Sequence, residues 1–365
     1  MKIILLNHVN FTTKYCDFWN KLEKYTKLKS LTNVCEDVVN NNIVYHHYYC
    51  VDRTETRPYN GMFQFDTTNY IMPKLYYDNI TLEQCIADRC AEIVNKNKKI
   101  ILMYSGGVDS ICFLVGFIKN YGYDFCREKM IVCANEQSIE GHSLFYEKFI
   151  RDKFELLSST DSNITLADKT YRDTVIVNGD PANLFDGAVL LEKIMRMNIG
   201  LDDKNWKQEI KNNYAHLFGL YHPNAYEHLM DVIESSANSR NYSVDNMFDF
   251  IWWYNNNLLY MAHSLNMLRY NYHMLNNNKL GKEYWFNRFI PFFQTDKFTL
   301  WAYNKKQEIL EDKLTEKIYK KHFKEYIKDF TGIDLKDYQG NAGFQQYLMK
   351  GRKEFTFLTN EYVPL

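Results

Sequence analysis

The residues best suited to chemistry lie in one short segment, Ser105-Gly106-Gly107-Val108-Asp109-Ser110, which we call the glycine loop. Two consecutive glycines allow the backbone to approach an anion closely, and the N–H groups of such a turn point toward that anion. The serine hydroxyls can donate hydrogen bonds to phosphoryl oxygens. Asp109 repels an anion unless a cation lies between them, which suggests a Mg²⁺ ion that bridges the phosphates. The segment therefore predicts a phosphate-binding loop that works with Mg²⁺.

The flanking segments have the patterns that such a loop needs. Residues 100–104 are a continuous apolar run, typical of a parallel strand covered on both faces, and residues 111–117 have the pattern of a buried helix. This order aims the N-terminus of the helix at a bound anion. The alternative is a purely structural turn, in which glycine relieves steric strain and serine caps the helix. We favour the phosphate loop because five specified positions coincide with the expected flanking elements.

Strands and helices alternate along the middle of the chain. Further apolar runs of strand length occupy residues 130–134 and 174–177. Apolar periodicity, with a capping box at residues 81–84, predicts helices over residues 82–95 and 143–157. After about residue 188 the strand signal fades, and helices are predicted within residues 200–238, 244–275 and 304–330. The alternation predicts an α/β fold with a parallel sheet joined by right-handed crossovers.

The first 78 residues have a different pattern. Short apolar and β-branched runs, at residues 3–6 and 43–51, are separated by turns rich in Asn and Thr. This pattern predicts a small β-containing N-terminal domain over residues 1–78. Residues 79–365 would then form a second domain, helical from about residue 190.

Composition excludes several classes of protein. With 44 Lys+Arg against 45 Asp+Glu, the net charge of −1 gives no global attraction to nucleic acids or anionic membranes. No apolar run approaches the ~20 residues that span a bilayer, and the N-terminus lacks the apolar core of a signal peptide. The eight cysteines lie within the first 133 residues and form no C-x-x-C pair. We expect a cytoplasmic protein with reduced thiols and no membrane partner.

Three segments carry a resemblance to a known family. The glycine loop resembles the pyrophosphate loop of the N-type ATP pyrophosphatases, which include asparagine, GMP, NAD, argininosuccinate and β-lactam synthetases and tRNA lysidine synthetases. Two later segments are similar to loops of the asparagine synthetase-like members: the second loop (residues 177–187, VNGDPANLFDG) and the third segment (residues 288–296, RFIPFFQTD). The resemblance covers roughly residues 79–303. It implies a parallel sheet of the ATP pyrophosphatase (HUP-like) type and cleavage of ATP between its α and β phosphates.

The resemblance also implies roles for individual residues. ATP would be bound by Ser105, Gly106, Gly107, Val108, Asp109, Ser110 and Gly179, and Mg²⁺ by Asp109, Asp180 and Asn183. Asp180 and Lys353 would be catalytic, Lys353 within residues 350–355, which resemble a basic segment that stabilises the acyl-adenylate and pyrophosphate. A solvated charged tail is an equal alternative for that segment. The second loop is one residue short, and Asn183 stands where the family has an acidic residue, which leaves Asp180 or Asp186 to supply the second carboxylate.

These observations predict an ATP-dependent, AMP-forming carbon–nitrogen ligase. A carboxylate or related oxygen, on a small molecule or a macromolecule, would attack the α-phosphate, and ammonia or an amine would then displace AMP to form an amide. Glutamine-dependent asparagine synthetases have a cysteine nucleophile after Met1, but this chain has Lys2 there, and 78 residues are too few for their glutaminase domain. The nitrogen is therefore expected as ammonia or an amine, with a separate ammonia source as a potential partner.

Two other functions stay open. Enzymes that modify RNA bases share the loop, but the thiouridine synthases use cysteines beyond the ATP core, and no cysteine follows Cys133. The near-neutral charge also disfavours a tRNA substrate without excluding nucleic acid. A degenerate, non-catalytic subunit that binds ATP or AMP would account for Asn183 and the shortened second loop.

Overall fold

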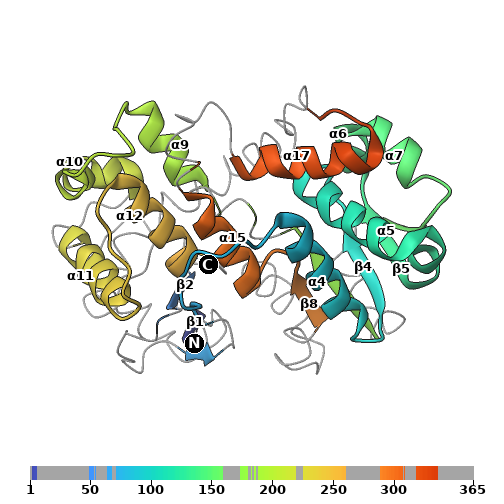
Figure 1. The fold of residues 1–365 in the computed structure, drawn as a ribbon, viewed down its shortest axis with the longest axis horizontal. Coiled ribbons are helices and arrows are strands. Elements are labelled where there is room, and N and C mark those ends of the chain that lie inside the picture. Colours follow the sequence, from blue (N-terminus) through green and yellow to red (C-terminus); the bar gives the residue numbers. More distant parts are fainter. Residues whose placement is uncertain are drawn as a thin grey trace, which may run out of the picture. The chain divides into compact units, whose positions relative to one another are not determined.

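The structure is a computed structural model that divides into two units (Figure 1). It describes residues 2–5, 49–52, 54, 64–67, 71–158, 173–179, 182, 185, 188–218, 225–259, 288–306, 308 and 318–335. One unit comprises residues 76–186 and 266–345, and the other comprises residues 1–75, 187–265 and 346–365. The domain boundaries expected at residue 78 and near residue 190 stay predictions.

The unit of residues 76–186 and 266–345 contains a five-stranded sheet in which every pair of neighbouring strands is parallel. In spatial order its strands are β6 (Glu155–Ser158), β5 (Met130–Ala134), β4 (Lys99–Met103), β7 (Thr174–Asn178) and β8 (Phe289–Pro291). Ile101 of β4 pairs with Ile131 of β5 on one side and with Ile176 of β7 on the other. The predicted α/β class with a parallel sheet is confirmed.

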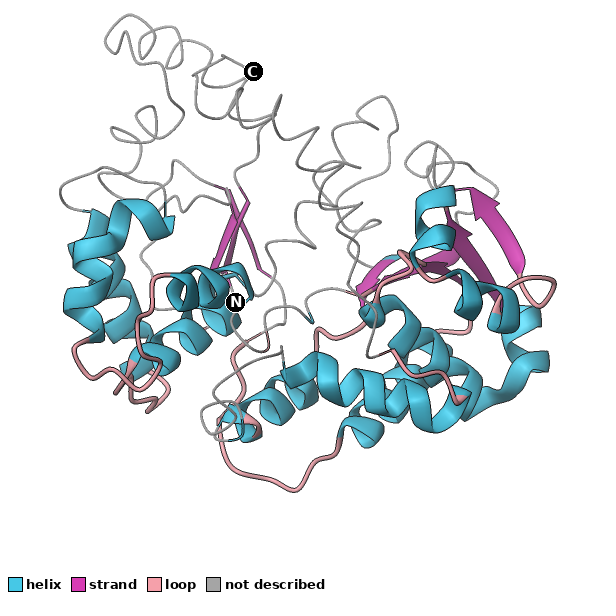
Figure 2. Ribbon diagram, turned by 90° about the horizontal axis from the view of Figure 1, so that it is seen from above, coloured by secondary structure: helices cyan, strands magenta, loops and turns pink. Residues whose placement is uncertain are grey.

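The central strands are apolar along their length because both of their faces are shielded from solvent. Every residue of β5 and β7 is buried, and so are the three middle residues of β4. Alternate residues of the strands, such as Ile100 and Leu102, join the core formed with α4 (Leu82–Val94), α5 (Val108–Lys129) and α17 (Ile318–Thr331). Helix α5 packs against both α4 and α17 (Figure 1), and its residues 110–118 are all buried. Figure 2 shows these strands fanned with the twist of an open sheet and helices of the same unit beside them.

Several predicted elements are confirmed close to their expected bounds. Helix α4 begins where the capping box predicted, since the Thr81 hydroxyl accepts a hydrogen bond from the Gln84 N–H at 3.1 Å, and it ends at Val94. Strand β5 has the predicted bounds, β7 extends one residue further than predicted, and β4 begins and ends one residue earlier than predicted. These elements are the ones with the clearest local pattern, either an apolar run or a capped apolar stripe.

One predicted helix is wrong in its extent, and one strand was not predicted. The helix predicted over residues 143–157 ends early, because α7 (Ser143–Phe149) is followed by Asp152 in the left-handed region with φ +58° and then by β6. Strand β8 was not expected, because the strand signal of the sequence fades after about residue 188. Within residues 304–330, where helices were expected, the structure has α17, and α15 (Asp296–Asn304) ends where this range begins.

The other unit combines an antiparallel sheet with helices. The sheet order is β2 (Tyr49–Asp52), β1 (Lys2–Leu5) and β3 (Gln64–Thr67). The helices are α9 (Ala188–Arg196), α10 (Trp206–Phe218), α11 (Ala225–Asn238) and α12 (Met247–Trp253), which continues as a π-helix, η3 (Tyr254–Leu259). Strands near the N-terminus and helices after residue 188 agree with the sequence pattern. Among the described helices, none has the length and apolar character needed to cross a membrane.

Gly116 allows α4 and α5 to approach closely. A Cβ at this position would lie 2.5 Å from Ile86 Cγ2 and 3.4 Å from Cys90 Sγ. We expect Gly116→Ala to destabilise the fold by about 1–3 kcal/mol, because overpacking a buried contact outweighs the ~1 kcal/mol gain in helix propensity. Urea unfolding measures the change. Adding Ile86→Leu, which removes the Cγ2 methyl, should restore part of the loss, and a stabilising Gly116→Ala would contradict this packing.

Candidate functional site

The glycine loop lies where the strand order of the parallel sheet reverses. The chain passes from β4 outward to β5 and β6, and it then crosses to β7 on the other side of β4. In open parallel sheets, ligands bind outside the carboxyl ends of the strands at such a reversal. The glycine loop follows β4 and Gly179 follows β7, so the two expected ATP-binding segments lie at this point.

Gly106 must be glycine in this fold. Its φ is +72°, in the left-handed region, and a Cβ there would lie 2.1 Å from the carbonyl oxygen of Ser138. Ser138 belongs to α6 (Glu136–Gly141), which follows β5, so the loop is pressed against the connection after the neighbouring strand. Gly107 differs, because its φ is −83° and the nearest atom to a Cβ would be Ser105 Oγ at 3.3 Å.

The two serines fold the glycine loop onto the start of α5. Ser110 Oγ donates to the Gly107 carbonyl oxygen at 2.9 Å, and the Ser105 backbone N–H donates to Ser110 Oγ at 3.3 Å. The Gly107 N–H donates to Ser105 Oγ, also at 3.3 Å. Ser110 is buried whereas Ser105 is exposed. Ser110 therefore shapes the turn, and Ser105 presents the more accessible hydroxyl to a ligand.

Asp109 lies at the junction of the glycine loop and the second loop. It occupies the first turn of α5 and is half-buried. A Cβ at Gly179 would lie 3.2 Å from Asp109 Cβ, so the backbone after β7 touches the first turn of α5. The structure thus brings Asp109 and Gly179 together. The other expected site residues, Asp180, Asn183 and Lys353, lie outside the described residues.

Phe185 links the second loop to α15. Its ring contacts those of Phe293, Phe298 and Trp301, with ring centroids 6.2, 6.1 and 5.8 Å away. Ala182 of the same loop is fully buried. The third segment is joined to β7, since the Phe292 N–H donates to the Asn178 carbonyl oxygen at 2.8 Å. All three segments that carry the family resemblance therefore meet at the carboxyl edge of the sheet.

Of the three residues expected to bind Mg²⁺, only Asp109 lies within the described part of the chain. Asp109 supplies a carboxylate, whose hard oxygen atoms suit Mg²⁺. Among the described residues, no three His, Cys, Asp or Glu side chains are grouped as a metal site requires. A complete Mg²⁺ site would therefore need Asp180 or Asn183, or oxygen atoms of bound phosphate.

Five of the eight cysteines belong to the buried core. Cys85, Cys90, Cys112, Cys126 and Cys133 are free and buried, which agrees with the expected reduced thiols. Burial raises the pKa of Cys133 to about 11 and the pKa values of Cys85 and Cys126 to about 12. These thiols stay protonated at neutral pH and are poor nucleophiles.

Two residues that shape the site were not anticipated from the sequence. Ser138 meets Gly106 through its backbone carbonyl, and no side-chain pattern reports such a contact. Arg89 of α4 is buried, and the sequence contains an indication of this. It lies three residues after Ile86, within the apolar stripe of the helix. A charged residue on an apolar stripe indicates a buried polar partner.

The geometry defines a class of site rather than a particular protein. A glycine turn leads into a helix N-terminus at the reversal of a parallel sheet, with a carboxylate in the first helical turn, which is an arrangement suited to a phosphate with a bound cation. No protein-family model, curated protein or solved structure matches this chain. The function proposed below therefore depends on these residues and on the resemblance of the three segments.

Proposed function

We propose that the chain is an ATP-dependent, AMP-forming ligase of the asparagine synthetase-like kind. The observation that supports this best is the meeting of Asp109 and Gly179, from the loops after β4 and β7, where the strand order reverses. Numbered along the chain, the strands lie in the order 3-2-1-4-5, which also supports a sheet of the ATP pyrophosphatase (HUP-like) type. The ligand would be ATP, with its pyrophosphate on the glycine loop.

The chain's own groups would act mainly by orientation and charge stabilisation. The N-terminal N–H groups of α5 and the Ser105 hydroxyl would hold the β and γ phosphates, and the helix dipole favours negative charge there. Asp109 would hold Mg²⁺ together with Asp180 and Asn183, and the ion when bound would neutralise charge on the departing pyrophosphate. Groups fixed in advance around developing charge supply most of the catalysis in such reactions.

The acceptor and the nitrogen donor complete the proposal. A carboxylate or related oxygen, carried by a small molecule or a macromolecule, would take the adenylate. Ammonia or an amine would then displace AMP and form an amide. A separate protein that releases ammonia is the partner that this chemistry calls for, and a cytoplasmic location is part of the same proposal.

Pyrophosphate exchange tests the first half-reaction. With Mg²⁺, ATP and pools of candidate carboxylates, the purified chain should incorporate radiolabelled pyrophosphate into ATP and release AMP once ammonium is added. With glutamine in place of ammonium it should form no glutamate. Release of ADP and phosphate would overturn the ligase. Nucleotide binding without any exchange would favour the degenerate subunit, and AMP formation that depends on added tRNA would favour the base-modifying enzyme.

A further inference from the structure

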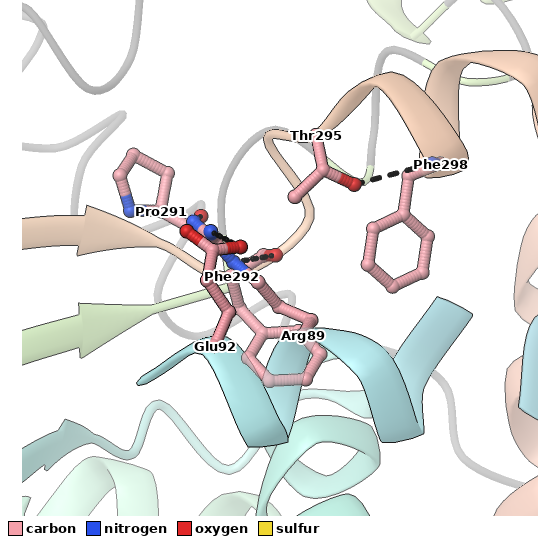
Figure 3. Close-up of polar contacts among 6 residues, drawn as sticks. All are labelled: Arg89, Glu92, Pro291, Phe292, Thr295 and Phe298. Atoms are coloured by element: carbon pink, nitrogen blue, oxygen red, sulfur yellow. Dashed lines mark hydrogen bonds and ion pairs between the residues drawn. The ribbon is translucent and has the colours of Figure 1, made fainter. Parts of the chain in front are cut away.

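Arg89 is a buried charged residue with several polar contacts, and the proposed chemistry gives it no role. Its Nε donates to the Phe292 carbonyl oxygen at 3.0 Å, and its Nη2 donates to the Pro291 carbonyl oxygen at 2.7 Å. Its Nη1 forms an ion pair with Glu92 Oε2 at 2.6 Å. The side chain is only 4% exposed. Figure 3 shows it reaching from α4 to the end of β8, where one guanidinium binds two successive carbonyl groups.

The backbone that Arg89 binds lies in the middle of the third segment, at the carboxyl edge of the sheet. Helix α15 begins at Asp296, four residues after Phe292. It is capped by the Thr295 hydroxyl, which accepts a hydrogen bond from the Phe298 N–H at 3.3 Å. Arg89 therefore fixes a short connection that has β8 at one end and a capped helix at the other. Phe293 and Phe298, within this connection and the first turn of α15, pack against each other with ring centroids 5.1 Å apart.

The same two phenylalanines contact the second loop. Phe185 packs its ring edge against Phe293 and stacks on Phe298, and Trp301 covers it from the next turn of α15. Phe293 is in turn stacked on Phe323 of α17 with a centroid distance of 4.8 Å. An unbroken series of contacts thus runs from the Arg89 guanidinium through the third segment to Phe185, six residues after Gly179.

We propose that Arg89 is a positioning residue for the second loop. By binding the Pro291 and Phe292 carbonyl groups, it fixes Phe293 and Phe298, and these fix Phe185 of the second loop. This proposal rests on the proposed function in one respect: the second loop carries Asp180 and Asn183, so a displaced loop would weaken binding of Mg²⁺ with ATP. Arg89 itself touches no reacting atom.

The guanidinium is required because of its shape. A planar fork can bind two adjacent carbonyl oxygens and a carboxylate at once, whereas a lysine ammonium is a point charge on a flexible stem. Arg89→Lys keeps the charge and most of the volume but removes the paired contact. Hydrogen–deuterium exchange of backbone amides in the ligand-free full chain then reports the position of each loop without any need for turnover.

We expect Arg89→Lys to accelerate exchange roughly tenfold in two places, residues 292–295 and the second loop, since a lost hydrogen bond to a charged group shifts a local opening equilibrium by at least this factor. Phe185→Leu breaks the series at its last contact and should accelerate exchange in the second loop alone. This second variant also keeps the inference testable if Arg89→Lys does not fold. Faster exchange in residues 292–295 of Arg89→Lys, with an unchanged second loop, would overturn the proposal.

Two control variants separate position from general stability. Arg288 is as buried as Arg89, but it binds the Thr174 carbonyl oxygen at 3.1 Å, at the amino end of β7. Arg288→Lys should lower the melting temperature and leave the second loop unchanged. Lys297 of α15 forms an exposed ion pair with Asp88 of α4. Lys297→Gln should change neither the melting temperature nor exchange in the second loop, because exposed pairs contribute little. Equal acceleration in Arg89→Lys and Arg288→Lys would mean that Arg89 only stabilises the fold.

Metal binding supplies the second measurement. Mn²⁺, as a paramagnetic substitute for Mg²⁺, can be titrated in the presence of an ATP analogue that resists cleavage between the α and β phosphates. Loss of a residue that orients metal ligands typically weakens metal affinity 10–100-fold, and we expect this range for Arg89→Lys and no change for Arg288→Lys. If the unaltered chain binds no Mn²⁺ with the analogue, the proposed function is overturned, while the exchange data still decide whether Arg89 positions the second loop.

Discussion

Asp109→Asn should reduce ATP–pyrophosphate exchange by roughly 10²–10³-fold or more, the loss seen when one oriented electrostatic contact is removed from a transition state. The substitution keeps the size of the side chain and deletes the charge that would hold Mg²⁺ between the carboxylate and the phosphates. It also removes an acidic group from the first turn of α5, where a negative charge stabilises the helix by about 0.3–1 kcal/mol. The melting temperature should therefore fall by only about a few degrees.

A matched control distinguishes the metal role of Asp109 from a helix effect. Glu136 lies in the first turn of α6, after the neighbouring strand β5, and is exposed. Glu136→Gln removes the same kind of charge from the first turn of a helix, and we expect exchange within a factor of about two or three of the unaltered chain. If Asp109→Asn and Glu136→Gln had equal, small effects, Asp109 would not hold the metal ion, and the ligase proposal would lose its central residue.

The parts of the fold that could be predicted are those whose pattern is local. Strands β4, β5 and β7 are shielded on both faces, so each is a continuous apolar run that a short window detects. Strand β6 is an edge strand with exposed residues, among them Leu156 at 47% exposure, and its pattern resembles a helix end. Strand β8 has three residues and exists because it pairs with β7, far away in the sequence. Such elements are determined by tertiary pairing, which no short window contains.

The candidate site likewise has a part that the local sequence predicts and a part that depends on distant residues. The glycine loop is found from the sequence because its residue types and its flanking elements are contiguous. The sequence can indicate that Arg89 is buried, but its partners are missed because they are backbone carbonyls about two hundred residues away. The sequence also treats Gly106 and Gly107 as equivalent, whereas the structure separates them by conformation and by what lies beside them.

Gly106 and Gly107 should therefore respond differently to substitution by alanine, and Gly107 serves as the control. Gly106→Ala places a side chain at φ +72°, which costs roughly 1–2 kcal/mol, and its Cβ would meet the Ser138 carbonyl oxygen, a backbone atom that moves only if α6 moves. The loop must therefore shift. A displacement of about 1 Å at a reacting group can reduce a rate ~10²-fold, so we expect pyrophosphate exchange to fall by at least about that factor together with a lower melting temperature.

Gly107→Ala changes the same element without that conflict. Gly107 is the N-cap of α5 with φ −83°, which alanine adopts readily, and the nearest atom to its Cβ would be a side-chain oxygen at 3.3 Å. Alanine is a weaker N-cap than glycine, so ligand-free stability should fall by at most about 1 kcal/mol. Thermal unfolding of the two ligand-free variants isolates the backbone effect from any contact with phosphate. If both variants melted alike, Gly106 would not need its left-handed conformation, the contact with α6 would not hold the loop, and the pyrophosphate would have no fixed backbone to bind.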